Sequence, residues 1–184
     1  LDRSSAASDV YKRQVLRNEP ERVNPTVTKT DRLFSEHRQG VFRYLCRLVG
    51  QSEPARDLTQ EVFLRVTRAG VPDTDAGGER AWVFSVARNL GLNFLRDGAR
   101  RPATGPMVER AAAPTQELAV ALNQALEALA DLDRDVFLMR EVGGLNYDEI
   151  AVACDLTPAA VRSRLHRARQ ELRATLAPAL RRTP

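Results

Sequence analysis

Apolar residues recur at steps of three and four positions along most of this 184-residue chain, and no stretch of useful length alternates between apolar and polar residues. Such spacing gathers apolar side chains on one face of a helix, whereas a half-buried strand needs alternation. In residues 31–49, for example, the apolar face consists of Phe34, Val41, Phe42, Leu45, Leu48 and Val49. The pattern predicts an all-α fold.

Helix breakers divide the predicted helices into two groups. Residues 100–115 contain four of them, namely Pro102, Gly105, Pro106 and Pro114. Each proline removes a backbone donor and opposes helix continuation. We therefore expect a flexible linker here, joining a three-helix domain (residues 30–99) to a four-helix domain (residues 116–178).

Both ends of the chain lack helical periodicity. We expect residues 1–29 to form a disordered leader and residues 179–184 to form a short tail. Residues 1–14 look foreign to the rest of the chain and are interpreted as a non-native segment, so they are left out of the fold reasoning.

Capping residues indicate where the helices begin. In the first domain we expect helices over residues 31–49, from residue 52 to just before Gly70, and over residues 79–97, with a polar loop at residues 71–78. In the second domain we expect helices over residues 115–130, 134–142, 147–154 and from residue 158 to about residue 177. The expected N-cap residues are Ser52, Asp131 or Asp133, Asn146 with Glu149 as its capping-box partner, and Thr157.

The most specific pattern lies in residues 146–169. A short capped helix, a turn at Asp155 and Leu156, and a longer basic helix match a helix-turn-helix. The apolar face of the second helix comprises Val161, Leu165, Ala168 and Leu172. The side chains that then point outward from its first turns are Ala159, Arg162, Ser163, His166 and Arg167, with Arg164 flanking them. A helix of this width enters the major groove of DNA, where arginine bonds guanine and Ser or His bonds other base edges.

Charge is distributed unevenly within a net charge of +4. Residues 115–155 hold nine acidic and two basic side chains, whereas residues 156–184 hold seven basic and one acidic. A concentrated basic surface is typical of phosphate binding.

The sequence gives no support to an enzyme, a metal site or a cofactor. It contains no His-Glu-x-x-His motif, no glycine-rich phosphate loop and no Cys or His cluster with metal-ligand spacing. Cys46 and Cys154 lie far apart in apolar patterns, which argues against a disulfide framework. The longest apolar runs reach about five residues, so we expect no membrane insertion and a cytoplasmic protein.

Three motifs occur in order along the chain. Residues 57–66 read DLTQEVFLRV, residues 81–90 read AWVFSVARNL, and residues 146–151 and 160–169 read NYDEIA and AVRSRLHRAR. They resemble, in that order, the core-binding helix of region two, the promoter-melting helix that follows it, and region four of the extracytoplasmic-function (ECF) sigma factors. These proteins are the minimal two-domain class of bacterial transcription initiation factors. The proline-rich linker between the second and third motifs makes the resemblance specific.

The resemblance implies three binding surfaces. Region four would enter the minus-thirty-five major groove through Ala159, Arg162, Ser163, Arg164, His166 and Arg167. Region two would hold the opened minus-ten strand through Trp82, Arg88, Asn89, Asn93 and Arg96, with the loop of residues 73–79 as the wall of a pocket for an extruded base. A shared helix face would dock on the beta-prime clamp helices of RNA polymerase through Asp57, Gln60 and Glu61.

Further partners that the resemblance implies are the polymerase beta flap and an anti-sigma factor. The acidic segment of residues 115–155 would face polymerase or solvent and so keep negative charge away from DNA. Two positions depart from the family pattern: Asp155 stands at a corner where glycine is common, and Asn93 stands where many relatives have Asp. Since Asp tolerates left-handed backbone geometry better than most residues, we expect the turn to survive.

Simpler interpretations remain open for some residues. Trp82 lies on an apolar stripe, which favours a core role over a wedge against the last base pair. Glu61 and Arg65 would form an ordinary surface pair at helical spacing.

Two other classes of protein also remain open. One is a stand-alone helix-turn-helix regulator that binds duplex DNA, and the other is a helical adaptor that binds only protein. The arginine and asparagine face of residues 79–97 favours a sigma factor, because a sensing domain needs no strand-tracking surface. We therefore predict a sigma factor that directs bacterial core RNA polymerase to specific promoters and helps to open the minus-ten DNA, without doing chemistry itself.

Overall fold

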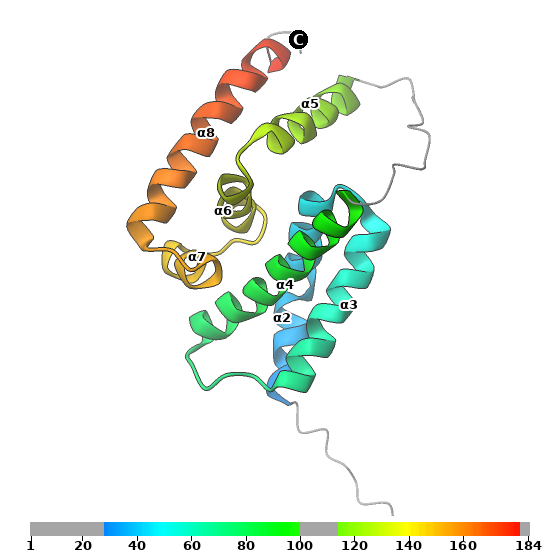
Figure 1. Ribbon diagram of the computed structural model, residues 1–184, viewed down its shortest axis with the longest axis vertical. Helices are drawn as coiled ribbons and strands as arrows, with labels where there is room; N and C mark the ends of the chain where they lie inside the picture. Colours follow the sequence, from blue (N-terminus) through cyan, green and yellow to red (C-terminus); the bar gives the residue numbers. More distant parts are fainter. Residues whose placement is uncertain (1–27, 100–113, 181–184) are drawn as a thin grey trace, which may run out of the picture.

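The computed structural model describes residues 28–99 and 114–180, and within those ranges the chain forms seven helices and no strand (Figure 1). The first bundle comprises α2 (Lys29–Val49), α3 (Ser52–Ala69) and α4 (Ala76–Ala99). The second bundle comprises α5 (Pro114–Ala128), α6 (Asp131–Glu141), α7 (Tyr147–Cys154) and α8 (Pro158–Leu180). The predicted all-α fold with two helical groups is confirmed. The predicted leader, most of the linker and the tail fall largely or wholly outside the described residues.

Several helix ends follow the local signals that the sequence contains. The Asn146 side chain accepts a hydrogen bond from the backbone N–H of Glu149, and the Glu149 carboxylate accepts one from the N–H of Asn146, which completes the predicted capping box. The Thr157 hydroxyl accepts from the N–H of Ala160 at 3.2 Å, as expected for the start of α8. Asp155 has φ 54° and ψ 54°, so it makes the left-handed turn that glycine makes more easily.

Two predicted N-caps are wrong. Gln51, not Ser52, occupies the N-cap position of α3, and Ala130 occupies that of α6; neither makes a side-chain cap bond. Asp133 is unavailable as a cap because its carboxylate is bonded to arginines of α8. Helix α4 also begins three residues earlier than predicted, because the Asp75 carboxylate accepts a hydrogen bond from the N–H of Gly78 at 2.7 Å.

One hydrophobic core runs through both bundles, which lie against each other. In α2 the fully buried residues include Leu33 and Tyr44, whereas Phe34 is 40% exposed and Phe42 is only partly buried. Val41, Leu45, Leu48 and Val49 of the predicted apolar face are buried, so the prediction is wrong for Phe34 and missed the burial of Leu33 and Tyr44. The reason is that α2 packs on α6 of the second bundle as well as on α3 and α4.

The bundles pack closely where the α6–α7 turn meets α4. A Cβ atom added at Gly143 would lie 2.7 Å from the carbonyl oxygen of Met139 and 2.8 Å from Cε1 of Phe84. Only glycine fits at such a close approach between a backbone and a ring. Phe84 is 1% exposed, so α4 is buried on the side facing the second bundle as well as inside its own bundle.

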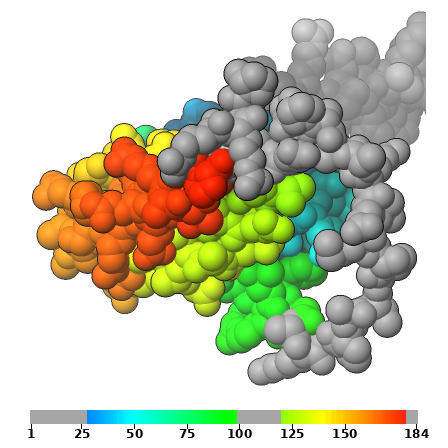
Figure 2. Space-filling model, turned by 90° about the horizontal axis from the view of Figure 1, so that it is seen from above, coloured from blue at the N-terminus to red at the C-terminus, as the bar shows by residue number. Residues whose placement is uncertain are grey.

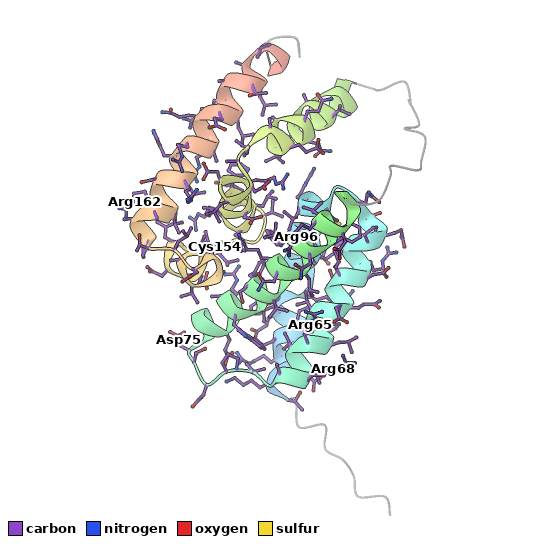
Figure 3. The ribbon with its side chains drawn as sticks, in the orientation of Figure 1. Arg65, Arg68, Asp75, Arg96, Cys154 and Arg162 are labelled. Atoms are coloured by element: carbon purple, nitrogen blue, oxygen red, sulfur yellow. The ribbon has the colours of Figure 1, made fainter. Side chains whose placement is uncertain are left out.

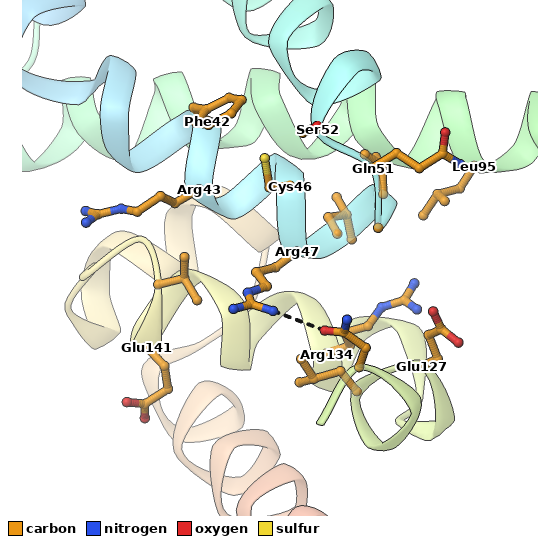
Figure 4. A pocket seen from close by; sticks show the side chains of 16 residues that line it. Phe42, Arg43, Cys46, Arg47, Gln51, Ser52, Leu95, Glu127, Arg134 and Glu141 are labelled. Atoms are coloured by element: carbon orange, nitrogen blue, oxygen red, sulfur yellow. Dashed lines mark hydrogen bonds between the residues drawn. The ribbon is translucent and has the colours of Figure 1, made fainter. Parts of the chain in front are cut away.

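Away from this contact the bundles leave a cavity of about 850 Å³, which α2, α4, α5 and α6 line (Figure 4). Arg47 crosses it and donates a hydrogen bond to the Asn123 side chain at 3.1 Å. In the second bundle the surface of α5 lies against that of α8 (Figure 2). Within residues 28–99 and 114–180, no helix combines the length and apolar character that crossing a membrane requires.

Two valines test the predicted packing of the helix-turn-helix. Val161 of α8 is fully buried, whereas Val152 of α7 is 64% exposed. Val161→Ala should lower the free energy of unfolding by about 2 kcal/mol, because two buried methyl groups are lost and a cavity remains. The matched Val152→Ala should change it by less than about 0.5 kcal/mol. Urea unfolding followed by circular dichroism measures both, and equal effects would contradict the assigned faces of these helices.

Candidate nucleic-acid interface

The second bundle presents one face of α8 to solvent. Burial of Val161, Leu165, Ala168 and Leu172 sets the orientation of the helix. The five side chains predicted to face outward are all exposed, namely Ala159, Arg162, Ser163, His166 and Arg167. The Ser163 hydroxyl donates to the carbonyl of Ala159 at 3.1 Å, and the side chains of His166 and Gln170 are 2.9 Å apart. Figure 3 shows Arg162 on the outer side of α8, and its guanidinium carbon lies 6.0 Å from the ring centroid of Tyr147 of α7.

Two arginines of this helix also carry structural bonds. Arg164 Nη1 lies 2.7 Å from Oδ1 of Asp133, and Arg167 Nε lies 3.1 Å from Oδ2 of the same carboxylate. The Asp133 side chain is 5% exposed, so it depends on these partners for its hydrogen bonds. Arg164 is mostly buried, but Arg167 keeps 57% of its side chain exposed and can still contact a ligand.

The acidic segment does not lie wholly at the surface as expected. Asp133, Asp135 and Glu149 are buried, with 4%, 0% and 8% exposure. Each has a cationic partner in the fold: Asp133 binds arginines of α8, Asp135 binds Arg88, and Glu149 lies 3.5 Å from Arg80. The expectation that this segment faces polymerase or solvent is therefore wrong for these three carboxylates. Arginines of α4 and α8 offset the cost of removing their charges from water, so the carboxylates can be buried.

Four of the five residues predicted for the opened strand lie together on α4. Trp82, Asn89, Asn93 and Arg96 follow one another at helical steps of seven, four and three residues along one side of α4. Asn89, Asn93 and Arg96 are exposed, and Arg96 donates a hydrogen bond to the Asn93 side chain. Trp82 packs partly against the core, as the simpler interpretation held, but one part of it remains accessible.

This side of α4 forms a groove with α3 that sequence reasoning missed. The groove has a volume of about 510 Å³, and its lining consists of Arg65, Arg68 and Ala69 of α3 with Trp82, Val86 and Asn89 of α4. Both arginines are exposed, and Figure 3 labels them along the lower half of α3. An aromatic ring, an amide and two guanidinium groups are the side chains that bind an unpaired nucleotide by stacking, base-edge bonds and phosphate contacts.

Arg88 does not join the other four. Its Nε lies 2.8 Å from Oδ2 of Asp135, and this ion pair connects α4 to α6 of the other bundle. Burial raises the pKa of the Asp135 carboxyl, and the charge and hydrogen bond of Arg88 oppose that shift. In this arrangement Arg88 is committed to a carboxylate rather than free to bind a ligand.

The loop predicted as a pocket wall is shorter than expected. Residues 76–79 belong to α4. Glu79 is 3% exposed, and its carboxylate forms ion pairs with Lys29 and Arg32 of α2. The hydrogen bond from Lys29 lowers the pKa of Glu79. Only residues 70–75 remain as the connection between α3 and α4.

The third predicted set lies on the exposed side of α3. Asp57 and Gln60 are exposed, and Glu61 forms an ion pair with Arg65 at 2.7 Å, the ordinary pair that was considered for it. Beside Gln60, a groove of about 380 Å³ between α2 and α3 exposes part of Phe34 and Phe42. A protein partner could contact the acidic side chains and these rings together.

Neither thiol lies in a setting that favours reactivity. Burial raises the pKa of Cys154 to about 11, and burial also raises the pKa of Cys46. Within the described ranges, no group of three or more His, Cys, Asp or Glu side chains could hold a metal ion.

Two family models match the chain. The model described as sigma-70 region 2 matches residues 33–101, and the model described as sigma-70, region 4 matches residues 119–172. The first range covers most of the first bundle, and the second covers most of the second bundle.

Known relatives match across both bundles. The ECF RNA polymerase sigma factor SigE of Mycolicibacterium smegmatis is 34% identical over 159 residues, which cover 80% of this chain and 61% of that protein. The ECF RNA polymerase sigma factor SigL of Mycobacterium tuberculosis is 34% identical over 155 residues, which cover 78% of this chain and 86% of that protein. The chain thus spans less than two-thirds of the length of SigE and most of the length of SigL.

Two solved structures share the fold with a TM-score of 0.60 each. One is the sigma factor RpoE in complex with the anti-sigma factor NepR from Bartonella quintana, at 19% identity over 79% of this chain and 95% of that chain. The other is CnrH in complex with the cytosolic domain of CnrY, at 26% identity over 81% of this chain and 88% of that chain. At 19% identity the first likeness shows the fold alone.

Arg164 and Arg162 of α8 differ in their predicted importance for stability. Arg164→Ala should lower the free energy of unfolding by about 1–3 kcal/mol, because it removes a hydrogen-bond partner from buried Asp133. Arg162→Ala, two residues away on the exposed face, should change it by less than about 0.5 kcal/mol. Thermal unfolding compares the two variants, and an unchanged midpoint for Arg164→Ala would show that Asp133 does not need this arginine.

Proposed function

The chain belongs to the ECF RNA polymerase sigma factors, and from this membership we propose that it directs bacterial core RNA polymerase to specific promoters and helps to open the minus-ten DNA. It is a promoter-specificity subunit rather than a stand-alone regulator. The observation that carries the proposal is that one chain holds both sigma-70 regions, each with its own exposed surface suited to nucleic acid.

Region 4 reads the paired upstream element. The exposed face of α8 enters the major groove at the minus-thirty-five element, where Arg162, Ser163, His166 and Arg167 meet base edges and Ala159 allows close approach. Arg164 acts mainly through Asp133, holding α8 at its angle to α6, and it contacts DNA only at the edge of the surface. Phosphate contacts position the helix, whereas base contacts carry the specificity.

Region 2 holds the unpaired minus-ten strand. A base of the non-template strand stacks beside Trp82 in the groove between α3 and α4, and Asn89 bonds its edge. Arg65 and Arg68 hold the neighbouring phosphates. Asn93 and Arg96 contact the same strand further along α4. Such a surface has no use in a regulator that binds only duplex DNA, and this distinguishes the two functions.

The exposed side of α3 docks on core polymerase. Asp57, Gln60 and Glu61 face the beta-prime clamp helices, and region 4 approaches the beta flap. Polymerase carries out all the bond formation, so the sigma factor itself is no enzyme, needs no cofactor and works in the cytoplasm where the promoters are.

An anti-sigma factor is the further partner. The two neighbouring structures are both complexes, one of them of a sigma factor with an anti-sigma factor. In this chain the cavity between the bundles offers a site for such a protein, because it combines the apolar Phe42, Leu95 and Leu126 with three arginines. These arginines are Arg43, Arg47 and Arg134 (Figure 4).

Run-off transcription with purified core polymerase and a randomised promoter library tests the function. The protein should give transcripts from a small set of start sites that share upstream and minus-ten sequences. Core polymerase alone is the control. No start-site selection, together with binding of palindromic duplexes by the protein alone, would establish the stand-alone regulator instead.

Charge reversal tests the polymerase surface. Glu61→Lys should weaken binding to core polymerase by about tenfold, or ~1.4 kcal/mol, because it places a positive charge in an acidic docking face. Glu36→Lys is the matched control, since Glu36 of α2 is exposed and lies outside that face. Fluorescence anisotropy with labelled protein measures both affinities. Equal affinity for the parent and Glu61→Lys would remove Glu61 from the interface.

A further inference from the structure

One buried carboxylate joins the first turn of α4 to the first turn of α2. The Glu79 side chain is 4% exposed, with its Oε1 2.7 Å from Lys29 Nζ and its Oε2 bonded to Arg32 Nη2. Each carboxylate oxygen therefore has its own cation, which offsets the cost of removing the charge from water. The hydrogen bond from Lys29 lowers the pKa of Glu79, so this carboxyl is ionised at neutral pH. Because Glu79 is buried, it cannot itself contact DNA.

Lys29 extends this cluster to the loop between α3 and α4. Its Nζ also donates to the backbone carbonyl of Pro72 at 3.0 Å, and the same carbonyl accepts the N–H of Thr74. The proline ring fixes its own φ and restricts the residue before it, Val71, to extended geometry. Val71 in turn packs against the core. The first half of the loop is thus held by packing at Val71 and by the Lys29 bond at Pro72.

The second half of the loop is held by the first turn of α4. The Asp75 carboxylate accepts the N–H of Gly78, and the Asp75 carbonyl accepts the N–H of Glu79 at 2.9 Å. Figure 3 shows Asp75 where the loop turns into α4. Thr74 lies directly against Gly78, where an added Cβ would be 2.7 Å from the threonine hydroxyl oxygen. The position of Glu79 therefore determines the positions of Thr74 and Asp75.

This loop joins the two walls of the groove assigned to the unpaired strand. Ala69, the last residue of α3, lines the groove and directly precedes the loop. Trp82 lines the other wall, less than one helical turn after Glu79. Asp73 and Thr74 of the loop are exposed. The conformation of the loop therefore shapes the end of the groove where the tryptophan lies.

We propose that Glu79, Lys29 and Arg32 are positioning residues for promoter recognition. They hold the loop of residues 70–75 in one conformation, and this conformation sets which minus-ten base is accepted beside Trp82. The inference rests on the proposed function, because it takes the groove as the site of that strand. A fixed loop presents one set of polar groups, which a wrong base leaves unpaired. A released loop adapts to several bases, so selectivity falls more than overall binding.

Promoter selection measures the effect of the loop on base choice. Run-off transcription with core polymerase and a library randomised in both promoter elements is repeated with Glu79→Gln, which removes the charge at nearly constant shape. Preference at one or two minus-ten positions should fall by about three- to tenfold, and preference in the upstream element should not change. A merely structural role would lower transcription from every sequence alike. That outcome, or an unchanged minus-ten profile, would overturn the proposal.

Glu36→Gln is the matched control. The Glu36 carboxylate is exposed and lies 3.9 Å from Arg32 Nη1, so this variant removes a charge near the same arginine without altering Glu79. Its promoter profile should match that of the parent within about twofold, because exposed ion pairs contribute little. The same relaxation in both variants would show that net charge near Arg32, rather than the loop, sets the preference, and it would overturn the proposal.

Lys29→Met provides a second test if Glu79→Gln fails to fold, as judged by circular dichroism. Lys29 is 39% exposed, Arg32 remains bonded to Glu79, and the capping box of Thr28 and Asp31 still starts α2. This variant should relax the preference at one or two minus-ten positions, because it removes the bond to the Pro72 carbonyl. Weaker transcription from all sequences alike, as expected from loss of a positive charge alone, would overturn the proposal.

Hydrogen exchange measures the loop in the absence of DNA. The amide protons of Thr74 and Gly78 should exchange about tenfold faster in Glu79→Gln and Lys29→Met, while those of α8 keep the rates of the parent. Unchanged exchange at both amides would overturn the proposal. A parent that selects no promoter would overturn the proposed function, whereas faster exchange with an unchanged minus-ten profile would overturn this inference alone.

Discussion

Burial of α4 on two sides is the constraint on which the rest of this structure depends. One side packs within the first bundle through Val83 and Leu90, and Phe84 packs against the α6–α7 turn of the second bundle. A helix covered on two sides has only a strip left for function. That strip carries Asn89 and its helical neighbours, whereas Arg88 lies on the covered side. Packing thus gives the adjacent residues Arg88 and Asn89 different roles.

The same packing explains the uneven distribution of charge along the chain. The acidic segment comes directly before the basic one, and in the fold α6 and α7 supply carboxylates to arginines of α4 and α8. Buried charges are tolerated because each has an opposite charge within hydrogen-bond reach. The charges that remain exposed are therefore fewer than the sequence contains, although Arg167 of α8 stays more than half exposed while it binds Asp133.

Features that depend on neighbouring residues were predictable. The capping box of Asn146 and Glu149, the left-handed Asp155 and the buried stripe of α8 all involve side chains within a few positions of one another. The groove of Arg68 and Trp82 was not predictable, because it joins helices whose relative rotation no local signal contains. Exposure of Phe34 in place of Leu33 was missed for the same reason.

The amino-acid sequence by itself determined the helices, the helix-turn-helix and the family, because these follow from residue spacing, backbone capping and motifs in a recognisable order. Only the tertiary structure decided which arginines are available. Arg162 and Arg88 have the same chemistry, yet one faces solvent and the other binds a buried carboxylate from a helix 47 residues away in sequence. Pairings at that separation depend on how whole helices pack, and that packing buries apolar surface while it gives each buried charge a partner.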